Sequence, residues 1–176
     1  MELTPDELAG VVDVVGPLTH EELVQACGEL AFKRGEDVDS EAFEAAIDAA
    51  LATYHLVAVA SEGHAASKRS GDAAERDHDA DVDAPLVVVG PAAFPDIPEG
   101  TEDLPHILDV PGRDVSDEAA AVAAEQRFRD DAAEAVRARD DERIQTLLDV
   151  SYELEAWGPV ELSTARGRLD EATQSN

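Results

Sequence analysis

The sequence has a single cysteine, Cys27, among its 176 residues. One thiol cannot form a disulfide within the chain, and it excludes the clusters of several cysteines that hold zinc or iron–sulfur centres. Cys27 recurs with Leu23, Leu30 and Ala31 at helical spacing on an apolar face. We therefore expect a buried structural thiol rather than a nucleophile.

Long apolar runs and a basic leader are absent as well. No apolar run approaches the roughly 18 residues that a membrane-spanning helix needs. The opening residues, MELTPDELAG, lack the basic region that begins a signal peptide. Aromatic residues make up only 4% of the chain while the hydrophobic share is 44%, so we expect a core of small and medium side chains. These features predict a soluble, cytoplasmic protein without membrane contact.

Basic residues are scarce, because 13 lysines and arginines stand against 41 aspartates and glutamates, for a net charge of −28. The acids are spread along the whole chain rather than gathered in one tail. Such self-repulsion weakens a compact fold in dilute buffer, but molar salt shortens the Debye length to roughly 3 Å and screens most of it. The composition therefore predicts adaptation to high salt. In a salt-adapted protein the net charge reflects the solvent and says little about the molecules that the protein binds.

The motifs of common enzymes are missing too. Gly90 follows a strand-like run, yet no G-x-G-x-x-G or G-x-x-x-x-G-K-[ST] pattern is present, nor any G-x-S-x-G serine elbow. The histidines form no H-x-H or H-x-x-x-H pair for zinc. DHDADVD has the alternating aspartates of a calcium loop but lacks the glycine and glutamate that such a loop requires further on. We expect no enzyme activity, no cofactor, no metal site and no small-molecule substrate.

What is present is a series of helix signals over the first 54 residues. Thr4 and Thr19 each precede a helical apolar pattern and a glutamate three residues later, which predicts two capping boxes. The GP pair at 16–17 ends the first helix, and Gly35 ends the second. A third helix is predicted to start near Asp39 or Ser40. Its inward residues are expected to be Phe43, Ile47, Ala50, Leu51 and Tyr54.

Two strand-like runs follow, HLVAVA at 55–60 and PLVVVG at 85–90. Three helices followed by a hairpin is the order of a winged-helix domain, and we place such a unit at residues 1–94. The polar segment between the strands, residues 62–83, is predicted to be a disordered wing tip. The expected fold class is mainly α with a small β-hairpin, that is, α+β.

The rest of the chain divides into a strap and a helical segment. Five prolines lie between residues 91 and 112, so residues 95–115 are predicted to form an extended strap without a helix. Phe94, Ile97, Ile107 and Leu108 are expected to pack onto the core. Residues 116–176 show three helical apolar patterns and are predicted to form a three-helix segment.

Three stretches carry a resemblance to known proteins: GPLTHEELVQACGELAFKRG, GPAAFPDIPEGTEDLPHILDVP and LLDVSYELEAWGPVELSTARGRLD. They resemble a family of uncharacterised haloarchaeal proteins, and the likeness covers almost the whole chain outside residues 62–83. The resemblance implies a salt-adapted chain built as one module. It implies no activity, since none is known for the family.

The outer face of the third helix carries carboxylates where a DNA-reading helix offers arginine, asparagine or glutamine to the bases. We therefore predict a non-enzymatic module that binds a protein partner or self-associates. A role in a regulatory complex is one form that this function could take. The candidate partner-binding residues are Glu41, Glu44, Asp48, Phe94, Ile97 and Trp157. The alternative is a DNA-binding transcriptional regulator that contacts DNA through the wing. Its basic residues would be Lys68, Arg69 and Arg76, set among seven acids in the same insert.

Overall fold

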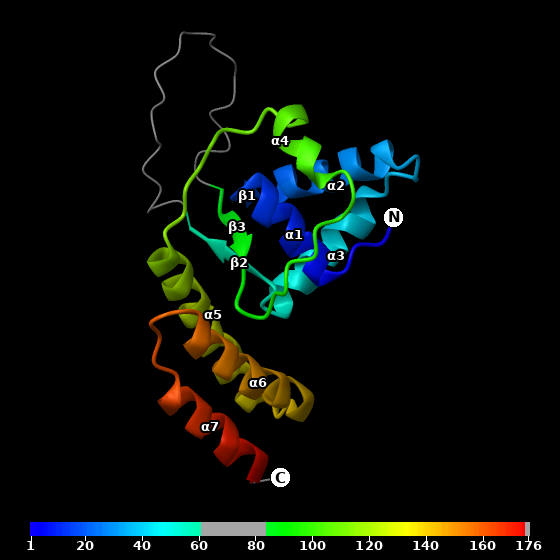
Figure 1. The fold of residues 1–176 in the computed structure, drawn as a ribbon. Helices are drawn as coiled ribbons and strands as arrows, with labels where there is room; N and C mark the ends of the chain where they lie inside the picture. The colour runs from blue at the N-terminus through cyan, green and yellow to red at the C-terminus, as the bar shows by residue number, and fades with distance from the viewer. Residues whose placement is uncertain (61–83, 175–176) are drawn as a thin grey trace.

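The computed structural model describes residues 1–60 and 84–174 (Figure 1). The predicted wing tip therefore lies outside the described residues. The first half contains α1 (Pro5–Val15), β1 (Leu18–Thr19), α2 (His20–Lys33), α3 (Ser40–Ala52), β2 (Leu56–Val59) and β3 (Leu86–Val89). The second half contains η2 (Thr101–Asp103), α4 (Leu104–Ile107), α5 (Asp117–Ala138), α6 (Asp141–Trp157) and α7 (Ser163–Gln174). The predicted α+β class is confirmed.

Both capping boxes form as the sequence predicts. The Thr4 hydroxyl accepts a hydrogen bond from the backbone N–H of Glu7 at 3.2 Å, and the Glu7 carboxylate accepts one from the Thr4 N–H at 2.8 Å. Thr19 and Glu22 repeat this reciprocal pair with the same two distances. Gly35 follows the end of α2 with a φ of 70°, a left-handed conformation that glycine adopts without steric cost.

Within the described residues the sheet has three strands, one more than the predicted hairpin. Its order is β1-β3-β2, and both pairings are antiparallel. Leu18 lies opposite Val87, and Leu56 lies opposite Val89. Strand β1 has only two residues and is too short to show a period-two pattern, so it could not be predicted from the sequence.

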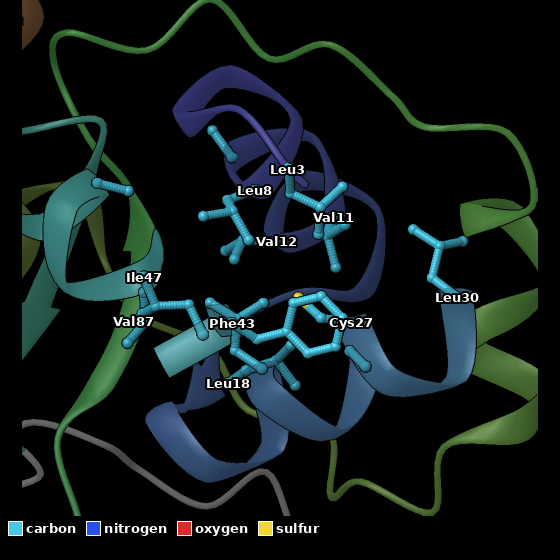
Figure 2. Close-up of a cluster of buried hydrophobic side chains, with 14 of the residues drawn as sticks. Leu3, Leu8, Val11, Val12, Leu18, Cys27, Leu30, Phe43, Ile47 and Val87 are labelled. Atoms are coloured by element: carbon cyan, nitrogen blue, oxygen red, sulfur yellow. The ribbon is translucent and has the colours of Figure 1, made fainter. Parts of the chain in front are cut away.

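A first core lies between α1, α2, α3 and one face of the sheet (Figure 2). Cys27 is fully buried in it, as predicted, and burial raises the pKa of its thiol to about 12. A thiol with so high a pKa stays protonated near neutral pH and is unreactive. The labelled members of this core are Leu3, Leu8, Val11, Val12, Leu18, Cys27, Leu30, Phe43, Ile47 and Val87.

A second core lies on the opposite face of the sheet, against α5 (Figure 1). Strand β2 serves both cores, because Leu56 belongs to the first while Val57 and Val59 belong to the second. This alternation is the period-two geometry of a strand with both faces covered. Helices α6 and α7 complete the second core, with Phe128 and Leu147 fully buried. The division of the chain into domains at residues 94 and 115 stays a prediction.

The strap differs from the prediction in two respects. It contains a short helix, α4, in which Pro105 occupies an early position where its missing N–H costs no hydrogen bond. It also buries different residues: Leu104 and Leu108 enter the first core, whereas Phe94, Ile97 and Ile107 are exposed. The predicted packing was right only for Leu108, since the turn of α4 directs Leu104 and Leu108 inward together.

Candidate interaction surfaces

The outer face of α3 is acidic in the structure. Phe43, Ile47 and Ala50 face the first core, so the opposite side of the helix is solvent-exposed. The predicted residues Glu41, Glu44 and Asp48 all lie on this exposed side. No lysine or arginine occurs in α3.

A hollow of about 380 Å³ lies beside this face, between the start of α2, the end of α3 and the hairpin. Glu21 lines it, and the Asp48 carboxylate lies 3.5 Å from the His20 imidazole at its edge. A phosphate backbone following α3 would therefore meet one further carboxylate, that of Glu21, in this hollow.

Two exposed apolar side chains lie beside α1, one on Phe94 directly before the strap and one on Ile97 within it. Phe94 is 80% exposed and Ile97 is 53% exposed. Their backbone is nevertheless held, because the Phe94 N–H donates to the Asp6 carboxylate at 2.8 Å and the Asp96 N–H donates to the Asp6 carbonyl at 3.0 Å. Two large apolar groups are thus displayed in water on a fixed backbone.

Gly10 makes this attachment possible. A Cβ atom at position 10 would lie 2.1 Å from the Asp96 carbonyl oxygen and 3.1 Å from the Ile97 Cα. Such distances are far inside van der Waals contact, so only glycine allows the strap to lie this close to α1. The sequence shows Gly10 only as an unexplained glycine within a helix.

Trp157 lies at the end of α6 and is 37% exposed. A Cβ atom on the following residue, Gly158, would lie 2.8 Å from the Cβ of Ala121, so the end of α6 packs closely on α5. Trp157 is thus an exposed aromatic side chain beside a close contact of α6 with α5. Trp157, the Phe94–Ile97 pair and the α3 carboxylates lie on three different elements. No hydrogen bond or ion pair joins these groups to one another within the described residues.

A partly buried polar cluster around Tyr54 connects the two halves of the chain. Tyr54 follows α3, has a φ of 62°, and is fully buried in the second core. Its hydroxyl donates to the Asp131 carboxylate at 2.8 Å, which also accepts from Arg143 at 2.6 Å. Arg143 donates in addition to the Ala52 carbonyl at 2.9 Å, while Arg127 lies over the Tyr54 ring at 5.2 Å. The cluster ties the end of α3 to α5 and α6.

The chemistry of this cluster is structural. Burial, reinforced by the negative charge of Asp131, raises the pKa of the Tyr54 hydroxyl. The phenol therefore remains a neutral donor near neutral pH. The helical apolar pattern predicts Tyr54 on the inner face of the third helix but does not predict its partners. Asp131 and Arg143 are distant in sequence and lie among many other charged residues.

The far end of the strap is anchored by an ion pair between Arg113 and Glu22, the same glutamate that caps α2. Burial acts to raise the pKa of Glu22, but the hydrogen bonds from Arg113 and from the Thr19 backbone outweigh it and lower the pKa. Both side chains are largely shielded from water, with exposures of 19% for Arg113 and 14% for Glu22. The strap is therefore fastened to α1 at one end and to α2 at the other.

A family model described as a family of unknown function, DUF7109, matches residues 6–174. The chain belongs to this family. No curated protein and no solved structure matches it. The match to DUF7109 includes residues of both cores and of the strap, so the family model covers nearly all of the described structure.

Within residues 1–60 and 84–174, no group of three histidine, cysteine, aspartate or glutamate side chains could hold a metal ion. None of the helices in these two ranges is long and apolar enough to cross a bilayer. The basic residues of the alternative prediction, Lys68, Arg69 and Arg76, lie outside the described residues.

Proposed function

We propose that this chain is a non-enzymatic, cytosolic protein-binding module built on a winged-helix-like N-terminal unit. The order α1-β1-α2-α3-β2-β3 supports the winged-helix assignment, and so does the pairing of β1 with β3. In this arrangement α3 occupies the position of the recognition helix. The second core covers the face of the sheet opposite to α1, α2 and α3.

The observation that carries the proposal is the exposure of Phe94 and Ile97 on a fixed backbone. Exposed apolar groups of this size mark interaction sites when they lie together. Holding the backbone in advance lowers the entropy cost of binding, so such a pair is suited to anchor a partner. The partner is another protein or a second copy of this chain.

DNA binding is the weaker candidate because of the charges around α3. Glu41, Glu44 and Asp48 would face phosphates and repel them, and α3 offers no arginine to a base edge. High salt would screen that repulsion, but it also removes the counterion-release gain that drives phosphate contacts. The protein-binding reading meets neither obstacle.

We also propose that the acid excess adapts the chain to brine, in keeping with a haloarchaeal origin. The net charge of −28 and the exposed carboxylates of α3 support this reading. On this account the free energy of unfolding rises steeply with KCl up to molar concentration, because screening relieves self-repulsion. Urea denaturation at several KCl concentrations measures it, and a stability that is flat or falls with salt would contradict it.

The partner-binding proposal is tested with two phenylalanines of similar exposure. Phe94, directly before the strap, is 80% exposed and Phe32 at the end of α2 is 74% exposed. The unaltered chain is expected either to self-associate or to retain a specific protein from an extract at native salt. We expect Phe94→Ser to abolish this binding. Phe32→Ser is expected to leave it intact. Sedimentation velocity measures the first property and affinity capture with mass determination measures the second.

Three outcomes of this experiment count against the proposal. The first is an equal loss in both variants, which indicates general stickiness. The second is no loss in Phe94→Ser, which removes the strap from the interaction. The third is a shift of duplex DNA by the unaltered chain at the same salt, which favours the DNA-binding regulator instead.

A further inference from the structure

A cleft of about 650 Å³ opens between α5, α6 and α7, away from the strap and α3. Its volume falls within the range of about 300–1,000 Å³ that is typical of small-molecule sites. The apolar part of its lining comes from all three helices. These residues are Ala132, Ala133, Val136, Ile144, Ala165 and Ala172.

Arginines surround this apolar lining. Arg129, Arg139 and Arg168 line the cleft, together with the carboxylates Asp141 and Glu171. Arg129 is already engaged, since it donates to Glu125 at 2.6 Å and to the Glu161 carbonyl at 3.1 Å. Arg139 and Arg168 are exposed and have no side-chain hydrogen bond or ion pair among the described residues.

Three of the nine arginines among the described residues have no side-chain hydrogen bond or ion pair, although carboxylates outnumber bases in the sequence by 41 to 13. The other cations of the described part are paired or hydrogen-bonded, with Arg137 as the further exception. The engaged side chains are those of Lys33, Arg34, Arg113, Arg127, Arg129, Arg143 and Arg166. Two of the three unpaired arginines therefore border one cleft.

Arg139 also occupies a backbone position that favours another residue. It ends α5 with a φ of 56°, a left-handed conformation that glycine or asparagine adopts at lower cost. The turn between α5 and α6 thus keeps a long cationic side chain at the rim of the cleft.

We propose that this cleft binds a small amphiphilic anion, namely a free medium-chain carboxylate. The apolar tail lies between the three helices against Val136 and Ile144, where water is displaced from alanine-rich walls. The head group lies at the rim, where the guanidinium groups of Arg139 and Arg168 donate charge-assisted hydrogen bonds to its oxygens.

The probe for this site is 8-anilinonaphthalene-1-sulfonate, an amphiphilic anion whose fluorescence rises in apolar surroundings. We expect saturable binding to the folded chain, displacement by octanoate, and much weaker displacement by octan-1-ol, which has the same tail without the charge. Far-UV circular dichroism under the same conditions confirms that each protein is folded. This control matters because the dye also binds partly folded chains.

Three variants locate the site. Arg139→Gln and Arg168→Gln are each expected to weaken octanoate binding about three- to tenfold, the loss of one charge-assisted hydrogen bond at a partly exposed position. Arg137→Gln is the matched control, since Arg137 is another exposed, unpaired arginine of α5 but does not line the cleft. Ala133→Trp fills the cleft from an exposed position and is expected to abolish dye binding.

The proposal is overturned if the folded chain binds no dye, or if octan-1-ol displaces it as well as octanoate does. It is also overturned if Arg137→Gln weakens binding as much as Arg139→Gln and Arg168→Gln, because the effect would then be general electrostatics. Undiminished binding by Ala133→Trp places the ligand elsewhere and has the same consequence. None of these outcomes bears on the strap, so the two proposals stand or fall separately.

Discussion

The Tyr54–Asp131 hydrogen bond connects the end of α3 to α5, and its removal gives the sharpest test of how the two halves are joined. Tyr54→Phe deletes only the hydroxyl that donates to Asp131 at 2.8 Å. The ring keeps its edge-on contact with Phe128, whose centroid lies 6.4 Å away. The variant thus separates the hydrogen bond from the packing.

The expected cost follows from the surroundings of the carboxylate. A hydrogen bond to a charged group contributes about 1.5–3 kcal/mol. Asp131 keeps its partner Arg143 at 2.6 Å in the variant, and its side chain is 23% exposed, so water can replace the lost donor. We therefore expect the lower end, about 1.5 kcal/mol, which corresponds to a fall in melting temperature of about 4 °C for a chain of this length.

Urea denaturation in molar KCl measures this difference, followed by circular dichroism and by the fluorescence of the single tryptophan, Trp157. The matched control is Tyr152→Phe. Tyr152 is 62% exposed and its hydroxyl has no hydrogen bond within the described residues, so we expect no change. Equal midpoints for Tyr54→Phe and Tyr152→Phe would refute the structural role assigned to the cluster around Tyr54.

Further predictions concern pH and the strap. Tyr54 is the sole tyrosine of the Tyr152→Phe variant, and its pKa is raised in the folded state. The free energy of unfolding therefore falls as the pH rises above about 10, the pKa of an unfolded tyrosine. We expect the absorbance of tyrosinate at 295 nm to increase only as the protein unfolds and its circular dichroism is lost. The lowered pKa of Glu22 contributes stability above its unfolded pKa. Glu22→Gln should therefore be about 1 kcal/mol less stable at neutral pH in urea denaturation, with the deficit shrinking below about pH 4. Gly10→Ala should destabilise the chain through the clash with the strap. Gly28→Ala, whose Cβ would lie 3.5 Å from Val38, should stabilise it by about 0.5–1 kcal/mol in the same assay.

The sequence by itself determined the local elements and the class of fold. Thr4 and Thr19 fixed two helix starts, because a capping box involves only residues three apart in the chain. The apolar stripes identified α5 and α6, since helical periodicity is also a local property. The exposed carboxylates of α3 followed from the same periodicity, as the outer face is defined once the inner face is known.

Only the tertiary structure decided which elements meet and what they leave uncovered. Strand β1 is defined by its pairing with β3, and the exposure of Phe94 by the way α1 holds the strap at Gly10. The partners of Tyr54 and the cleft that Arg139 borders depend on α5 and α6 packing together. Side chains so distant in sequence leave no periodic signal. In a chain with 41 acids, no pattern singles out the one carboxylate, Asp131, that accepts hydrogen bonds from both Tyr54 and Arg143.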